Sequence, residues 1–155
     1  KTLILRYSTF NFNFSNNFHS DLKEIDLSFS KWISFDMKLV FQDSKYLTHI
    51  HLVGLNLTTH FLQTYFTFNI YIILRQIDLS QNLLDYIPES MFKFNPILEN
   101  LNLSYNFLYT ISESYFHFKS RLNINIFLNN NRIKLYRYKH FLNFDQSVIN
   151  LANNN

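Results

Sequence analysis

The stretch Leu98-Glu-Asn-Leu-Asn-Leu-Ser-Tyr-Asn-Phe-Leu108 decides the fold, because its pattern recurs along the whole chain. The pattern is Leu-x-x-Leu-x-Leu-x-x-Asn-x-Leu, and residues 74–84 repeat it with an isoleucine at the second apolar position. The third apolar position falls, repeat by repeat, at Leu5, Leu27, Leu52, Leu79, Leu103, Leu128 and Leu151. Successive spacings are 22, 25, 27, 24, 25 and 23 residues, so about seven copies of one structural unit fill the chain of 155 residues.

Residues 74–97 show how one unit is expected to fold. Ile77 and Leu79 alternate with polar residues, which is the two-residue period of a half-buried strand. We expect the strands of successive units to stack in parallel, about 4.8 Å apart. Asn82 follows at the turn, where its side chain can bond backbone groups left open at the end of the strand. The same asparagine recurs at Asn106, Asn131 and Asn154, which predicts a ladder through the array.

A phenylalanine in the returning part of each unit predicts a second, aromatic stack under the convex side. Its members are Phe18, Phe41, Phe66, Phe92, Phe116 and Phe141. The second and third units depart from the pattern. Ser30 replaces the asparagine in the second, and Leu55 replaces it in the third, where Asn56 comes one residue late.

These repeats resemble the typical class of leucine-rich repeats, of about 24 residues each. The resemblance implies an α/β repeat fold: a curved leucine-rich-repeat solenoid with parallel strands on the concave face and an irregular or short helical convex side. The class is common in animal extracellular receptors, including Toll-like receptors and related adhesion proteins, whose partners usually bind the concave face. We therefore expect a protein-recognition module of such a receptor. The alternative is an intracellular scaffold or regulatory subunit, because intracellular repeat proteins share the pattern.

We expect residues 1–155 to form a single array of about seven coils, with the first and last coils incomplete and without caps. The chain opens and stops inside a repeat, which indicates a segment of a longer protein. Any membrane contact would come from other parts of that protein, because the longest apolar stretch, residues 61–74, is shorter than the about 20 residues of a spanning helix. Uncapped coils expose apolar side chains, so the segment alone should self-associate.

The best candidates for partner binding are the outward positions of the strands and the turns after them. They are Glu24, Asp26, Phe29, His49, His51, Arg75, Asp78, Gln81, Asn100, Tyr105 and Phe127. Aromatic side chains among polar ones are typical of surfaces that recognise proteins. The competing interpretation is that these positions are merely solvated.

Two further groups suggest other chemistry. His49 and His51 are two residues apart on one strand, so both face the same side and could sense pH. A metal site is not expected, because no Cys, Asp or Glu in their unit completes one. Arg132, Lys134, Arg137 and Lys139 form a basic cluster, but on the returning limb, where we expect a solvated edge and no nucleic-acid site.

No enzymatic function is expected. The single glycine rules out a glycine-rich phosphate loop, cysteine nucleophiles are absent, and nothing places Ser, His and Asp in a triad. We expect neither a cofactor nor a small-molecule substrate. Three Asn-x-Ser/Thr sequons, at Asn13, Asn56 and Asn102, would carry glycans if the chain is extracellular. The absence of cysteine is equally compatible with a cytoplasmic location.

Overall fold

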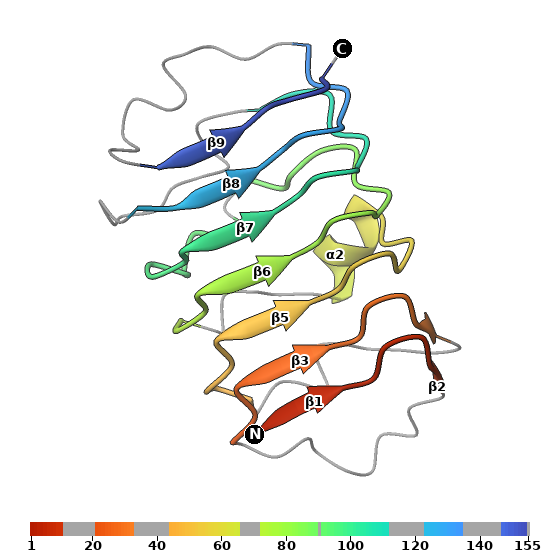
Figure 1. Ribbon diagram of the computed structural model, residues 1–155, viewed down its shortest axis with the longest axis vertical. Coiled ribbons are helices and arrows are strands. Elements are labelled where there is room, and N and C mark those ends of the chain that lie inside the picture. Colours follow the sequence, from red (N-terminus) through yellow and green to blue (C-terminus); the bar gives the residue numbers. More distant parts are fainter. Residues whose placement is uncertain are drawn as a thin grey trace.

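A parallel sheet of seven short strands forms the body of the molecule (Figure 1). The computed structural model describes residues 1–10, 21–32, 44–65, 72–89, 91–111, 123–134 and 147–154. The strands are β1 (Thr2–Ile4), β3 (Glu24–Asp26), β5 (His49–His51), β6 (Gln76–Asp78), β7 (Asn100–Asn102), β8 (Asn125–Phe127) and β9 (Val148–Asn150). They lie in the sheet in the same order as in the chain, so each coil adds one strand beside the previous one.

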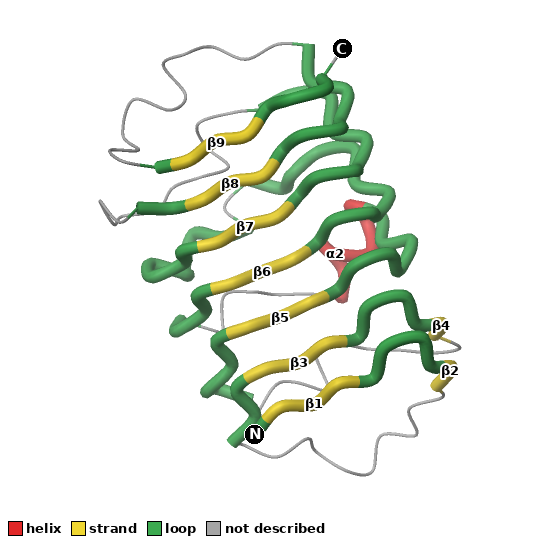
Figure 2. Tube along the Cα trace, viewed as in Figure 1, coloured by secondary structure: helices red, strands yellow, loops and turns green. Residues whose placement is uncertain are grey.

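Little other regular structure accompanies the sheet among the residues described (Figure 2). The strands β2 (Thr9–Phe10) and β4 (Lys31–Trp32) pair in parallel as a small second sheet after β1 and β3. The helix α2 (Thr59–Tyr65) follows β5. The expected fold class, a solenoid of leucine-rich-repeat type with irregular connections, is therefore confirmed.

The core consists of the apolar positions that define the repeat. The central residue of each inner strand is buried, and these residues lie opposite one another in register, as Ile25, Ile50 and Ile77 do. The leucine after each inner strand is buried as well. Phe92 is fully buried, as expected of the aromatic stack, whereas Phe18, Phe41, Phe66, Phe116 and Phe141 lie outside the described residues.

The asparagine ladder is confirmed, and Asn106 shows its bonding. The side-chain Nδ2 of Asn106 donates to the carbonyl oxygens of Leu79 at 3.0 Å, Leu103 at 3.1 Å and Ser104 at 3.2 Å. Its Oδ1 accepts the N–H of Leu84 at 3.0 Å. Each such asparagine thus bonds its own turn and the coil before it. Asn82, Asn131 and Asn154 make equivalent bonds.

The two irregular units alter this ladder in different ways. Ser30 replaces the asparagine in part, because its Oγ donates to the Leu5 carbonyl at 2.6 Å and accepts the Ser8 N–H at 3.3 Å. Leu55 has no polar side-chain atom, so it provides no such contact with the coil before it. The N–H of Leu55 is itself capped by Oδ1 of Asn82, at 3.0 Å. One step of the side-chain ladder is therefore missing between the second and third coils.

Every coil turns its corner through a residue in the left-handed backbone region. The residue two positions after the core leucine has φ between 54° and 64° in all seven coils: Tyr7, Phe29, Gly54, Gln81, Tyr105, Asn130 and Asn153. The N–H of each one but the last donates to a carbonyl of the next coil, as from Gln81 to Ser104 at 3.0 Å. Only Gly54 in this row lacks a Cβ, and a Cβ there would lie 2.5 Å from the ring of Phe29.

The ladder predicts a large stability effect for a single amide. Replacing Asn106 by alanine leaves the buried N–H of Leu84 and the carbonyls of Leu79 and Leu103 without this partner, which should lower the free energy of unfolding by roughly 3 kcal/mol. The control is Asn129, a half-exposed asparagine two residues after β8. Replacing it by alanine should lower the free energy of unfolding by less than about 0.5 kcal/mol. Urea denaturation measures both; equal effects would contradict the role given to the ladder.

Candidate binding face of the sheet

The outward side chains of the strands form two rows across the sheet, which we call the sheet face. They point outward because side chains alternate along a strand and the central residues are buried. The first row is Thr2, Glu24, His49, Gln76, Asn100, Asn125 and Val148, and the second is Ile4, Asp26, His51, Asp78, Asn102, Phe127 and Asn150. Most of these side chains are half-buried, so the sheet face is polar but well ordered.

Asp26 departs from the expectation of an exposed ligand-binding residue, because it is only 1% exposed. Arg6, in the turn after β1, forms an ion pair with its carboxylate and covers it. The N–H of Ser28 donates to the other carboxylate oxygen at 3.0 Å. The side chain of Asp26 is thus used to hold the first two coils together. A partner on this face would meet the exposed Arg6 in its place.

Burial and hydrogen bonding act in opposite directions on Asp26. Burial alone would raise the pKa of its carboxyl group. The hydrogen bonds from Arg6 and Ser28 together outweigh burial, and they hold the pKa of Asp26 below its usual value of 3.8. The same pair raises the pKa of the Arg6 guanidinium, chiefly through its hydrogen bond to Asp26.

The two histidines lie side by side with acidic residues on the sheet face. His51 Nε2 is 3.9 Å from Glu24 Oε1, and His51 lies in register between Asp26 and Asp78. His49 Nδ1 lies 2.9 Å from the hydroxyl of Thr48, in hydrogen-bonding contact. Among the described residues no three His, Cys, Asp or Glu side chains are arranged to hold a metal ion.

Amide side chains connect the strands in the second half of the sheet face. Asn125 Nδ2 donates to Asn100 Oδ1 at 2.8 Å. Asn102 Nδ2 donates to a carboxylate oxygen of Asp78 at 3.2 Å, and the other oxygen of Asp78 accepts the N–H and hydroxyl of Ser80 at 2.9 and 2.7 Å. Such cross-strand bonds fix side-chain positions before any partner arrives, which lowers the entropic cost of binding.

The remaining candidates lie at the edge of the sheet face. Arg75, just before β6, forms an exposed ion pair with Glu99 of the next coil. Phe29, Gln81 and Tyr105 are in the left-handed corner row, and Tyr105 is largely exposed. Phe127 is half-buried within the second row.

Sequence reasoning missed two residues of this face, Arg6 and Tyr7. The ring of Tyr7 stacks on that of Phe29 with centroids 5.1 Å apart and an angle of 7° between the planes. Both positions could have been found by aligning the first coil with the second, which places Arg6 beside Ser28 and Tyr7 beside Phe29.

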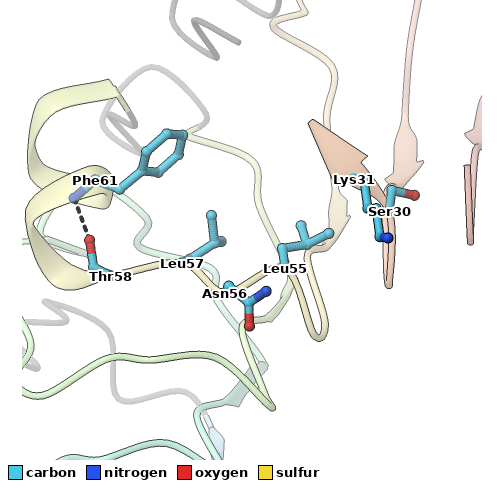
Figure 3. A pocket seen from close by; sticks show the side chains of 7 residues that line it. All are labelled: Ser30, Lys31, Leu55, Asn56, Leu57, Thr58 and Phe61. Atoms are coloured by element: carbon cyan, nitrogen blue, oxygen red, sulfur yellow. Dashed lines mark hydrogen bonds between the residues drawn. The ribbon is translucent and has the colours of Figure 1, made fainter. Parts of the chain in front are cut away.

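A groove lies where the ladder step is missing, away from the sheet face (Figure 3). It has a volume of about 520 Å³ and is lined by Ser30, Lys31, Leu55, Asn56, Leu57, Thr58 and Phe61. Figure 3 shows Ser30 and Lys31 on one side of the groove and the segment from Leu55 to Phe61 on the other. The sequon residue Asn56 is exposed here, two residues after Gly54. Asn102, by contrast, has its amide engaged with Asp78 and Ser104, and Asn13 lies outside the described residues.

Comparison with known proteins finds similarity among solved structures. No family model and no curated protein matches the sequence. Among solved structures, a chain from the Toll–Spatzle complex, described as a molecular hub in Drosophila development and innate immunity, is similar with a TM-score of 0.49 and 16% identity. The similarity covers 87% of this chain and 24% of that chain, so this chain spans about a quarter of its length.

The Arg6–Asp26 pair predicts how stability depends on acid. Because the pKa of Asp26 is lowered by folding, the pair stabilises the chain above about pH 4, and this stability is lost as the pH falls through the folded-state pKa. In Arg6→Gln the guanidinium no longer offsets burial, so the pKa of Asp26 should rise and acid unfolding should begin at a higher pH. Arg75→Gln removes an exposed pair and should leave the midpoint unchanged. Circular dichroism against pH measures the midpoints; identical curves for the two variants would refute the assignment.

Proposed function

We propose that this chain is the partner-binding part of a leucine-rich-repeat receptor and that it binds a protein through the sheet face. The proposal is for a binding function and not for a catalytic one. The observation that carries it is the sheet face itself: two rows of half-buried polar side chains, held in register by the strands. A surface of this kind is extended and preorganised, as stable protein recognition requires.

The distribution of side chains supports a protein as the partner. The first half of the sheet face has the acidic residues Glu24 and Asp78 with His51 between their strands, and the second half has amides with Phe127 among them. The charged region can orient a protein partner as it approaches, and the neutral region can form the centre of the interface. The exposed aromatic residues Tyr7, Phe29 and Tyr105 lie along the edge, where they would extend the contact.

We further propose that the chain is extracellular, with a glycan at Asn56. Asn56 is exposed and therefore accessible to a modifying enzyme, whereas Asn102 lies among bonded side chains of the sheet face. A glycan at Asn56 would project over the groove of Figure 3 and leave the sheet face uncovered. The location of the sequon is thus compatible with binding through the sheet.

Expression through a secretory pathway tests the location. Asn56 should be glycosylated and Asn102 should not, because only the first has a free, exposed amide. Mass spectrometry of peptides before and after glycosidase treatment measures occupancy, and Asn56→Gln is the control that should abolish the modification there. Glycosylation of Asn102 in folded protein would contradict the proposed sheet face. A secreted chain without glycan at Asn56 would count against the extracellular assignment.

A charge introduced at the centre of the sheet face tests the binding proposal. Gln76 lies in the middle of the first row, and its arginine variant adds bulk and charge to the proposed contact without changing the core. The probe is an arrayed panel of cell-surface and secreted proteins, with a panel of cytosolic proteins beside it. We expect a specific partner in the first panel, and Gln76→Arg should weaken its binding by about tenfold or more, which corresponds to about 1.4 kcal/mol.

The matched control makes the same substitution elsewhere. Gln63 is exposed on α2, away from the sheet, so Gln63→Arg should leave binding within about twofold. Surface plasmon resonance with circular dichroism as a folding check measures both variants. Equal weakening by the two would rule out the sheet face as the binding site. A partner found solely in the cytosolic panel would favour the scaffold function over the receptor.

A further inference from the structure

A second exposed surface lies beyond the corner row, on the segments that follow β6, β7 and β8. In each segment the ladder asparagine is followed by an exposed, a buried and an exposed residue. The buried residues are Leu84, Leu108 and Ile133, which belong to the core. The exposed ones are Leu83 and Asp85, Phe107 and Tyr109, and Arg132 and Lys134. The alternation therefore presents a patterned outer surface beside the sheet face.

Backbone hydrogen bonds place these three segments side by side. The N–H of Phe107 donates to the Leu84 carbonyl at 2.8 Å, and the N–H of Arg132 donates to the Leu108 carbonyl at 2.8 Å. The exposed side chains of neighbouring coils therefore lie next to one another. We define the lateral patch as the six exposed residues of these segments, Leu83, Asp85, Phe107, Tyr109, Arg132 and Lys134. Tyr109 is 55% exposed and Phe107 38%, so large aromatic surfaces face the solvent here.

Arg132 is the organising residue of the lateral patch. Its guanidinium lies over the ring of Phe107, with the central carbon 4.4 Å from the ring centroid. This cation–π contact fixes the plane of the guanidinium and leaves its N–H groups to solvent. The ion pairs found among the described residues involve neither Arg132 nor Lys134. Within the part of the chain that the structure describes, neither cation is paired with a carboxylate, and both lie next to the segment of Phe107 and Tyr109.

We propose that the lateral patch is a second docking surface, which binds an acidic segment of a protein partner. A carboxylate of the segment would accept two hydrogen bonds from the fixed guanidinium of Arg132, which is the geometry that arginine and carboxylate share. A neighbouring apolar side chain would lie on Tyr109. Lys134 would meet a second acidic group on the side of Tyr109 away from Asp85. Tyrosine and arginine together are the residue types that contribute most to binding at protein interfaces.

The geometry favours an acidic protein segment over a single-stranded nucleic acid. Bases need free aromatic faces for stacking, and one face of Phe107 is already covered by Arg132. A nucleic acid also needs cations spaced along a groove that follows its phosphates, whereas Arg132 and Lys134 are two residues apart on one segment. A single carboxylate at the edge of the guanidinium satisfies the donors that the patch presents.

Binding of a model peptide to the 155-residue chain tests the proposal. The probe is a short, labelled, unstructured peptide in which glutamate alternates with phenylalanine, and fluorescence anisotropy measures its affinity. We expect saturable binding that weakens with salt, and Arg132→Ala should reduce it by about tenfold, the effect of losing a charge-assisted hydrogen bond. Arg132→Lys should recover little of the loss, because an ammonium cannot form the paired contact. A glutamine-for-glutamate peptide should not bind.

A second exposed cation over an aromatic ring provides the matched control. Lys93 Nζ lies 5.4 Å from the centroid of the Phe94 ring, outside the lateral patch. Lys93→Ala removes the same charge and should change peptide affinity by no more than about twofold. Equal losses in Lys93→Ala and Arg132→Ala would show general electrostatic attraction and overturn the proposal. So would the absence of peptide binding, or tighter, Arg132-dependent binding of a thymidine oligonucleotide in the same assay.

Discussion

The structure depends on one constraint: the backbone groups at the end of every strand must find partners in the neighbouring coil. A coil cannot satisfy them alone, because its chain turns away from the sheet immediately after the core leucine. The asparagine side chain meets this need with two donors and an acceptor, directed both at its own turn and at the coil before it. Coil-to-coil contact is therefore polar at the corner and apolar beneath it. Each repeat is stable only as part of the stack.

Once the coils are stacked in this way, the direction and alignment of the outward side chains on the sheet face are determined. Burying the central residue of each strand sends its two neighbours outward, and parallel pairing aligns them in rows. The sequence can then vary at the outward positions with little effect on the fold. In this chain the first coils place charge there and the later ones place amides. The same scaffold therefore presents two chemically different halves on one continuous surface.

Much of this architecture is predictable from sequence, because it repeats. The core leucines, the strand register and the asparagine ladder all follow from a period that one can count. What departs from the period is harder to predict. Asp26 occupies an outward position in the pattern, and its burial depends on Arg6, which is 20 residues away in the coil before it. Stacking of Arg132 on Phe107 likewise depends on which rotamers two neighbouring coils adopt. Such contacts arise between repeats, and a pattern within one repeat does not encode them.

The groove is another feature that the repeat pattern alone does not predict. The sequence shows Leu55 in place of asparagine, but it does not show how the chain folds around that change. Its structural result is local: the third coil keeps its strand and its corner, while the segment after the corner diverges from the coil before it. A missing polar contact thus opened a space without interrupting the sheet, because the backbone pairing on either side continued across it.

The left-handed corner row has a consequence for how such a chain can change in length. The distance from core leucine to corner is two residues in every coil, although the coils themselves differ in size. All of that variation is therefore confined to the returning limb, beyond the corner. Insertions and deletions there leave the register of the outward rows untouched, whereas a single residue gained between leucine and corner would misalign the backbone bonds to the next coil. The corner thus separates the part of each repeat that can vary in length from the part that can vary only in side chain.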